Sequence, residues 1–141
     1  MKKYKVGYTT GVFDMFHVGH LNILKKAKEQ CDYLIVGVST DENVQSYKNK
    51  TPIIPYEERK MIVESIKYVD QVVPQENMDK YDAWKRLKFD VIFHGSDWKN
   101  SSMYNEIESK LKNEGVDFVY FDYTKGTSST ILREKLLSKG N

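Results

Sequence analysis

The stretch GVFDMFHVGH, residues 11–20, places two histidines and two glycines in ten positions, between an apolar run and an amphipathic one. The run before it, YKVGYTT at residues 4–10, predicts a β-strand. The segment after it, VGHLNILKKAKEQ at residues 18–30, repeats its apolar residues at helical spacing. The quoted stretch is therefore predicted to be the turn by which a first strand passes into a first helix.

The same alternation continues along the chain. DYLIVGVST, residues 32–40, is an apolar run rich in β-branched residues, which is typical of a strand buried on both faces. The polar stretch that follows, up to residue 55, is expected to be a loop because it contains Pro52 and Pro55. Further strands are expected at residues 71–74, 89–95 and 116–123, and further helices at 56–69, 80–87, 103–115 and 128–139.

Strands that alternate with helices form βαβ units. The sequence therefore predicts an α/β protein, a mainly parallel sheet with helices on both faces, in a single domain spanning residues 1–141. Every unusual short sequence falls where a predicted strand ends: residues 10–20, 39–50, 94–98 and 123–130. Ligands of open parallel sheets bind at the carboxyl ends of the strands, so these four turns indicate one site.

The composition argues against several partners. The 141 residues carry a formal net charge of +2, with basic and acidic residues interspersed, so no nucleic acid is expected to bind. Cys31 is the single cysteine, so no disulfide is expected within the chain. No apolar run has the length of a signal peptide or a membrane span, which favours a cytoplasmic protein with no membrane partner.

Within residues 11–20 the chemistry centres on His17 and His20. A helix N-terminus offers unpaired N–H groups and about half a positive charge, and Gly19 lets a phosphate approach the backbone closely. Two imidazoles three residues apart project from neighbouring positions of the first turn. Each can donate a hydrogen bond to a phosphoryl oxygen, and an imidazolium would add charge. This pattern favours phosphoryl or nucleotidyl transfer.

A helix cap, a satisfied core position and a metal site are other roles for the two histidines. A zinc ion needs two further ligands, and Asp14 alone does not complete the set. Because both histidines flank a glycine at the first strand–helix turn, the phosphate site is the preferred interpretation. No metal ligand is assigned to the protein.

GVFDMFHVGH resembles the H-x-G-H signature, with its G-x-F-D lead-in, of the nucleotidyltransferase superfamily that includes the cytidylyltransferases. DYLIVGVSTDE, YKNK, EERKMIVESIKYVDQVVP, HGSDW and TKGTSST agree with that family in the same order. The resemblance covers nearly the whole chain and is closest to the glycerol-3-phosphate, ethanolamine-phosphate and choline-phosphate cytidylyltransferases. It implies a Rossmann-like sheet. It also implies transfer of a cytidylyl group from CTP to a small phosphorylated alcohol, with release of pyrophosphate; the short chain and the K-x-K pair favour glycerol-3-phosphate.

The resemblance also implies roles for single residues. The implied catalytic residues are His17, His20 and Lys48, with the histidines stabilising the pentacovalent α-phosphorus. Lys48 and Lys50 form the K-x-K pair, of which one neutralises the nucleotide phosphates and the other the acceptor phosphate. The implied acceptor-binding residues are Lys50, Arg59, Lys67 and Trp98; packing is an equal alternative for Trp98.

TKGTSST resembles the second signature of the family, R-T-x-G-x-S-T-T. Its hydroxyls can cap the last helix, hold the β- and γ-phosphates, or do both. Tyr123 stands where the family has an arginine, so a fixed cationic fork is missing and the choice of CTP over another nucleotide stays open. The implied nucleotide-binding residues are Gly11, Val12, Phe13, Asp14, Gly19, Gly95, Asp97, Tyr123, Thr124, Gly126, Thr127, Ser128, Ser129 and Thr130.

The family further implies Mg²⁺ on the triphosphate, held mostly by phosphates and water, and a homodimer. Three alternatives stay open. The acceptor could be ethanolamine-phosphate or choline-phosphate, the enzyme could be an ATP-using adenylyltransferase of the same fold, or the chain could be a nucleotide-binding module without catalysis.

Overall fold

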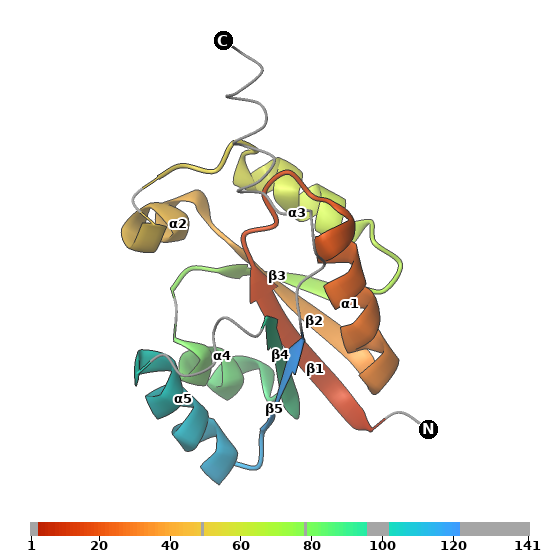
Figure 1. Ribbon diagram of the computed structural model, residues 1–141, viewed down its shortest axis with the longest axis vertical. Coiled ribbons are helices and arrows are strands. Elements are labelled where there is room, and N and C mark those ends of the chain that lie inside the picture. The colour runs from red at the N-terminus through yellow and green to blue at the C-terminus, as the bar shows by residue number, and fades with distance from the viewer. Residues whose placement is uncertain (1–2, 49, 78, 96–101, 122–141) are drawn as a thin grey trace.

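The computed structural model describes residues 3–48, 50–77, 79–95 and 102–121. Over these residues, strands and helices alternate (Figure 1). The strands are β1 (Tyr4–Gly11), β2 (Cys31–Ser39), β3 (Gln71–Gln75), β4 (Val91–Gly95) and β5 (Asp117–Phe121). The helices are α1 (Val18–Gln30), α2 (Asp41–Lys48), α3 (Tyr56–Glu64), α4 (Lys80–Leu87) and α5 (Ser102–Asn113).

The five strands form one parallel sheet in the order β3-β2-β1-β4-β5. The chain first builds outward from β1 to β3 and then returns to the other side of β1, so the strand order reverses between β1 and β4. The register pairs Thr9 with Phe93 across this point. Ligands of such sheets bind beside the reversal, at the carboxyl ends of the strands. The β1–α1 turn, with its histidines, begins at that position.

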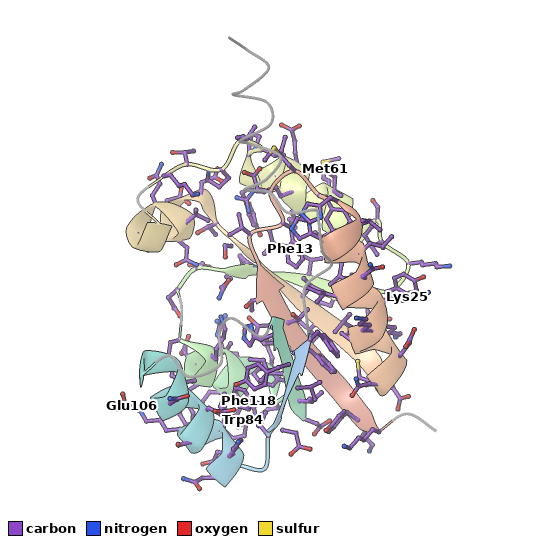
Figure 2. All side chains as sticks on the ribbon, viewed as in Figure 1. Phe13, Lys25, Met61, Trp84, Glu106 and Phe118 are labelled. Atoms are coloured by element: carbon purple, nitrogen blue, oxygen red, sulfur yellow. The ribbon has the colours of Figure 1, made fainter. Side chains whose placement is uncertain are left out.

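Helices cover both faces of the sheet. In Figure 1, α1 and α3 lie on one side of the strands, and α4 and α5 lie on the other. Each side has its own buried apolar cluster. Phe13 and Phe93 belong to the cluster under α1 and α3, while Tyr8 and Ile92 belong to the cluster under α4 and α5. Figure 2 shows the same division, with Phe13 beside α1 and α3 and with Trp84 and Phe118 beside α4 and α5. The predicted α/β sheet with helices on both faces is confirmed.

Two predicted elements differ from the structure, and a third lies outside its described residues. Residues 41–48, predicted as part of a loop, form α2, whose start is capped by the Thr40 hydroxyl accepting from the Asn43 N–H at 3.1 Å. The predicted helix 56–69 ends at Glu64, because the chain turns there to bring Asp70 back to β2. The predicted last helix, 128–139, lies outside the described residues. In the part of the chain that the structure describes, no helix is long and apolar enough to cross a membrane.

Candidate active site at the β1–α1 turn

The turn between β1 and α1 has an unusual backbone. Phe13 and Met15 have φ angles of 56° and 51°, in the left-handed region that side chains other than glycine rarely adopt. Each such residue costs about 1–2 kcal/mol, so the surrounding contacts must hold the turn in this shape. Gly11 makes the turn possible, because a Cβ at that position would lie 3.0 Å from the Phe13 ring. Phe13 itself is buried in the core, so any nucleotide contact it makes is through its backbone.

His17 and His20 cap the start of α1 for each other. His17 is the N-cap residue, and its Nδ1 accepts from the Gly19 N–H at 3.0 Å. In return, His20 Nδ1 accepts from the His17 N–H at 3.2 Å. The two rings are stacked with their centroids 3.9 Å apart. The pair is a capping box built from imidazoles instead of the usual hydroxyl and carboxylate.

This capping fixes the proton on each ring. A nitrogen that accepts a hydrogen bond carries no proton, so in the neutral imidazole the proton is on the other nitrogen, Nε2. Burial lowers the pKa of His17. The pKa of His20 falls to about 4, because the ring is buried, with Phe13 and Phe16 beside it, and because His17 is close. Both rings are therefore neutral near pH 7.

Among the residues that the structure describes, the donor that results has no partner. His17 Nε2 is buried, and no hydrogen bond within this part of the chain satisfies it. Buried donors are rarely left unpaired in native structures, because desolvation without a hydrogen bond costs about 1–3 kcal/mol. A neutral N–H donor held in place at a helix N-terminus can bind an oxygen that gains negative charge. His17 therefore presents a neutral Nε2–H donor at the start of α1, and its catalytic role stays a prediction.

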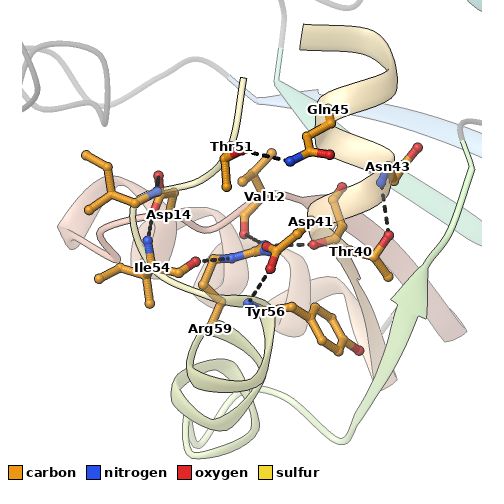
Figure 3. Close-up of polar contacts among 12 residues, drawn as sticks. Val12, Asp14, Thr40, Asp41, Asn43, Gln45, Thr51, Ile54, Tyr56 and Arg59 are labelled. Carbon is orange, nitrogen blue, oxygen red and sulfur yellow. Dashed lines mark hydrogen bonds and ion pairs between the residues drawn. The ribbon is translucent and has the colours of Figure 1, made fainter. Parts of the chain in front are cut away.

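Asp14 holds the turn against a distant segment. Its two carboxylate oxygens accept from the N–H groups of Ile53 and Ile54, both at 2.8 Å, and the residue is buried (Figure 3). These two contacts hold the turn against residues 53–54. The predicted nucleotide binding by Asp14 stays a prediction.

Arg59 on α3 was predicted to bind the acceptor, and the structure gives it another role. Its side chain has no exposed surface, and its guanidinium donates to three backbone carbonyls and one carboxylate (Figure 3). The acceptors are Val12 O at 2.7 Å, Ser39 O at 2.7 Å, Ile54 O at 2.8 Å and Asp41 Oδ1 at 2.5 Å. Arg59 therefore connects the β1–α1 turn to the last residue of β2 and the first residue of α2. Because its side chain is fully buried, it does not reach a substrate.

The predicted lysines divide into two groups. Lys67 is exposed and follows α3, which runs from the carboxyl edge of the sheet back to the amino edge. Three residues later, Asp70 accepts from the Leu34 N–H near the start of β2. Lys67 therefore lies at the edge opposite the histidines, and within one chain it cannot bind the same acceptor. Lys50 is exposed just after α2, on the histidine side of the sheet. Lys48 ends α2, and its side chain lies outside the described part.

The remaining predicted residues are placed only in part. Gly95 is the last residue of β4, beside the strand reversal. The N–H of Gly19 donates a hydrogen bond to Nδ1 of His17. The other nucleotide- and acceptor-binding predictions lie outside the described residues: Asp97, Trp98, Tyr123, Thr124, Gly126, Thr127, Ser128, Ser129 and Thr130. These stay predictions.

Sequence reasoning missed two buried polar residues on the α4 side of the sheet. Lys80 begins α4 and His94 lies near the end of β4, and both are almost fully buried. His94 is the first residue of the HGSDW stretch, which the sequence analysis singled out, but no role was predicted for His94 itself. Lys80 carries no signal in the sequence, because a lysine at the start of a short helix is ordinarily exposed.

A doubly wound parallel sheet, with a pair of imidazole donors at a helix start beside the strand reversal, defines a nucleotidyltransferase of the Rossmann-like class. The chain belongs to the cytidylyltransferase-like family, whose sequence profile matches residues 8–135. The family resemblance seen in the motifs is thereby confirmed.

Individual relatives agree with this assignment. The glycerol-3-phosphate cytidylyltransferase of Staphylococcus aureus is 37% identical over 132 residues, which are 93% of this chain and 94% of that protein. The FAD synthase of Pyrococcus horikoshii is 43% identical over 108 residues, 76% of this chain and 72% of that protein. Among solved structures, a lipopolysaccharide core biosynthesis protein from Thermoplasma volcanium has a TM-score of 0.75 and 29% identity, covering 86% of this chain and 99% of that one.

Proposed function

We propose that the protein transfers a cytidylyl group from CTP to glycerol-3-phosphate, giving CDP-glycerol and pyrophosphate. The observation that carries the reaction type is the buried, unpartnered Nε2–H donor of His17 at the start of α1. The choice of substrates is supported by the Staphylococcus aureus relative, which bears that name and matches over 93% of this chain.

The reaction is a direct displacement. A phosphate oxygen of the acceptor attacks the α-phosphorus of CTP, a new P–O bond forms, and the bond to the β-phosphate oxygen breaks, so that pyrophosphate leaves. No protein nucleophile is required, because a phosphomonoester dianion is already nucleophilic. Negative charge grows on the α-phosphoryl oxygens during attack, and the Nε2–H groups of His17 and His20 donate to them. Because both rings are neutral and fixed in orientation, they stabilise the transition state without losing a proton.

Mg²⁺ accompanies the triphosphate in this proposal. Over the described residues, no cluster of three His, Cys, Asp or Glu side chains could hold a metal ion. The Nδ1 atoms of the histidines are already used in capping, and imidazole is a poor ligand for this hard cation. The phosphates and water would supply most of the ligands, and the metal would neutralise charge on them.

A second candidate, an ATP-using adenylyltransferase, is favoured by the FAD synthase that is 43% identical over 108 residues. The geometry of the histidine pair would serve either nucleotide, because both present the same triphosphate. The base must then be selected by residues beyond the pair, and Tyr123, where the family has arginine, is the departure that bears on it.

Pyrophosphate release separates the candidates. The purified protein is incubated with CTP or ATP, with and without Mg²⁺, and with glycerol-3-phosphate, phosphoethanolamine or phosphocholine. Release with CTP and glycerol-3-phosphate, with CDP-glycerol identified by mass, is the expected result. Release with ATP alone would favour the adenylyltransferase, and nucleotide binding without release from any mixture would indicate a non-catalytic module.

We further propose that the active form is a homodimer acting in the cytoplasm, where CTP is available. The family implies the dimer, and one surface of the chain suits it. Met61 and Ile62 on α3 and Ile53 just before it are large apolar side chains that are 64%, 41% and 51% exposed. Exposed apolar groups gathered on one segment are typical of a surface that another protein covers.

A further inference from the structure

Residues 51–54, between α2 and α3, are held in place through their backbone. The N–H groups of Ile53 and Ile54 donate to the two carboxylate oxygens of Asp14, each at 2.8 Å (Figure 3). The Ile54 carbonyl accepts from Arg59 Nε at 2.8 Å. Connections between helices ordinarily lie on the surface and are more mobile than the helices themselves. This one instead has a fixed position against the β1–α1 turn.

Asp14 lies between this segment and the histidine pair. Burial lowers the pKa of His20, and the negative charge of Asp14 opposes this, so the carboxylate is close to the ring. The residues on either side of Asp14, Phe13 and Met15, have left-handed φ angles. Hydrogen bonds to a carboxylate are among the strong ones. Because Asp14 is buried and accepts two of them, it can hold the turn and residues 53–54 in one arrangement.

Lys50 directly precedes this segment. It is exposed and three residues before Ile53, so its Cα is at most about 11 Å from the Cα of Ile53. Thr51, the next residue, is joined to α2, because its hydroxyl accepts from Gln45 Nε2 at 2.8 Å (Figure 3). The backbone at Lys50 is thus held between α2 and the contacts of Asp14. A lysine side chain is flexible, so the reach of its ammonium group depends on where this backbone is fixed.

A cation at this position would supply what the histidine pair lacks. The two neutral imidazoles can donate hydrogen bonds, but they cannot neutralise the charge of phosphate groups. We propose that Asp14 is a positioning residue, which fixes residues 51–54 against the β1–α1 turn and thereby holds the Lys50 ammonium beside the histidine pair to bind a substrate phosphate. The inference rests on the proposed function. Asp14 then acts through the backbone of this segment and not by contact with the nucleotide.

The test is a double-mutant cycle between Asp14→Asn and Lys50→Met, measured as kcat/KM for pyrophosphate release from CTP and glycerol-3-phosphate. Asp14→Asn keeps the size of the side chain but leaves one acceptor oxygen for two N–H groups. Alone it is expected to lower kcat/KM at least about tenfold. In the double variant kcat/KM should be no lower than in Lys50→Met alone, because the positioned cation is already absent. A role in folding stability alone would give the same loss in both backgrounds.

Lys25→Met is the matched control, because Lys25 is an exposed lysine on α1 and the substitution removes the same charge. Asp14→Asn should lower kcat/KM by the same factor with Lys25→Met as in the wild type. Thr51→Val is the second variant, which decides the question if Asp14→Asn does not fold. It removes the exposed hydrogen bond to Gln45 and should lower kcat/KM about two- to threefold, again only when Lys50 is present. A Thr51→Val protein with wild-type kcat/KM would then overturn the inference.

Other outcomes overturn the inference in distinguishable ways. If Asp14→Asn lowers kcat/KM by the same factor with and without Lys50, Asp14 acts on the site by another route. If Asp14→Asn or Lys50→Met is as active as the wild type, the positioned ammonium is not needed, although cytidylyl transfer stands. If the wild-type protein releases no pyrophosphate with any acceptor, the proposed function itself fails.

Discussion

At the residue scale, His17 and His20 use their two nitrogens for different tasks. Each Nδ1 accepts a backbone N–H of the helix start, so the proton of each neutral ring is on Nε2. In the proposed function the same side chains both shape the anion site and donate to its ligand. A substitution can separate these tasks if it keeps the acceptor and removes the donor.

His17→Asn is such a substitution, because asparagine is a good N-cap residue but lacks a donor at the position of Nε2. We expect kcat to fall about a hundredfold, as on the loss of one oxyanion donor, with little change in stability. His17→Ala should lose activity to the same extent and also about 1 kcal/mol of stability. Steady-state kinetics and urea unfolding of both variants test this. Full activity in His17→Asn would show that Nε2 does not act on the substrate.

The lowered pKa of His20 predicts a pH dependence of stability. The folded-state pKa is about 4 and the ordinary value is 6.5, so between these pH values the unfolded chain binds more protons. Stability is thus expected to rise from pH 4 to pH 6.5, by up to about 3 kcal/mol from this residue. Urea unfolding across that range measures the slope. In His20→Gln the increase of the unfolding free energy with pH should be smaller. An unchanged increase would show that other groups cause it.

Arg59 is expected to be the most sensitive residue that touches no substrate. Arg59→Met leaves three backbone carbonyls and the Asp41 carboxylate without their donor, which costs about 3–5 kcal/mol. Thermal unfolding should show the loss, whereas Lys112→Ala, which removes an exposed side chain 3.6 Å from Glu108, should stay within about 0.5 kcal/mol. An equal effect of the two substitutions would contradict the buried network.

At the element scale, the sequence predicted the elements whose pattern is local. The apolar spacing of α1 and α4 gave their bounds correctly, and β2 was recognised as a buried strand. The helix α2 was missed because its apolar content is low and two prolines follow it. Its start does carry a signal, Thr40 followed by two acidic residues in the first turn. The helix α3 was predicted too long, because its end is set by tertiary contacts of Asp70 with β2 and with Lys28 of α1.

The site could be predicted from the sequence only where its chemistry is local. His17 and His20 stand in one motif, so both were identified. Arg59 was assigned to the acceptor because a basic residue in a family motif suggests a charged ligand. Its actual partners are backbone carbonyls from three segments, and no sequence pattern shows carbonyl positions.

The helix α4 gives a prediction of its own, since Lys80 is buried at its start. The folded-state pKa of Lys80 is about 7 and the ordinary value is 10.5, so between these values the unfolded chain binds more protons. Stability should rise with pH over this range, by at most about 5 kcal/mol from this group. Its neighbours do not obscure the effect: the pKa of His94 is lowered well below this range and that of Tyr8 is raised.

The measurement is urea unfolding at pH 7, 8.5 and 10. Lys80→Met should be more stable than the wild type at pH 7, and the difference should shrink as the pH approaches 10. Lys85→Met should follow the wild-type curve at every pH. A Lys80→Met variant that is less stable than the wild type at pH 7 would show that the ammonium has a partner in the folded protein.

At the scale of the whole molecule, the two faces of the sheet differ in how they relate to the β1–α1 turn. The α1 and α3 side supports this turn through Asp14, Arg59 and the core around Phe13. The α4 and α5 side has its own apolar cluster and buries Lys80. Substitutions of Asp14 or Arg59 should therefore lower turnover by displacing the turn.

The outer surface of α3 leads to the last prediction. Met61 and Ile62 are exposed on a helix whose inner side is fixed by Arg59 and Val63. If a second copy covers these side chains, the dimer contact stabilises α3 in both chains. Because Arg59 of α3 donates to the β1–α1 turn, loss of the dimer would also weaken the support of that turn. Sedimentation at micromolar concentration should give about twice the chain mass of 16.5 kDa. Met61→Glu should shift this toward one chain and lower kcat together, since a charge cannot be buried there without a partner. Tyr33→Ser is the control, because Tyr33 is 41% exposed on β2, away from α3. It should change neither the sedimenting mass nor kcat. A Met61→Glu protein that sediments like the wild type would place the dimer contact elsewhere.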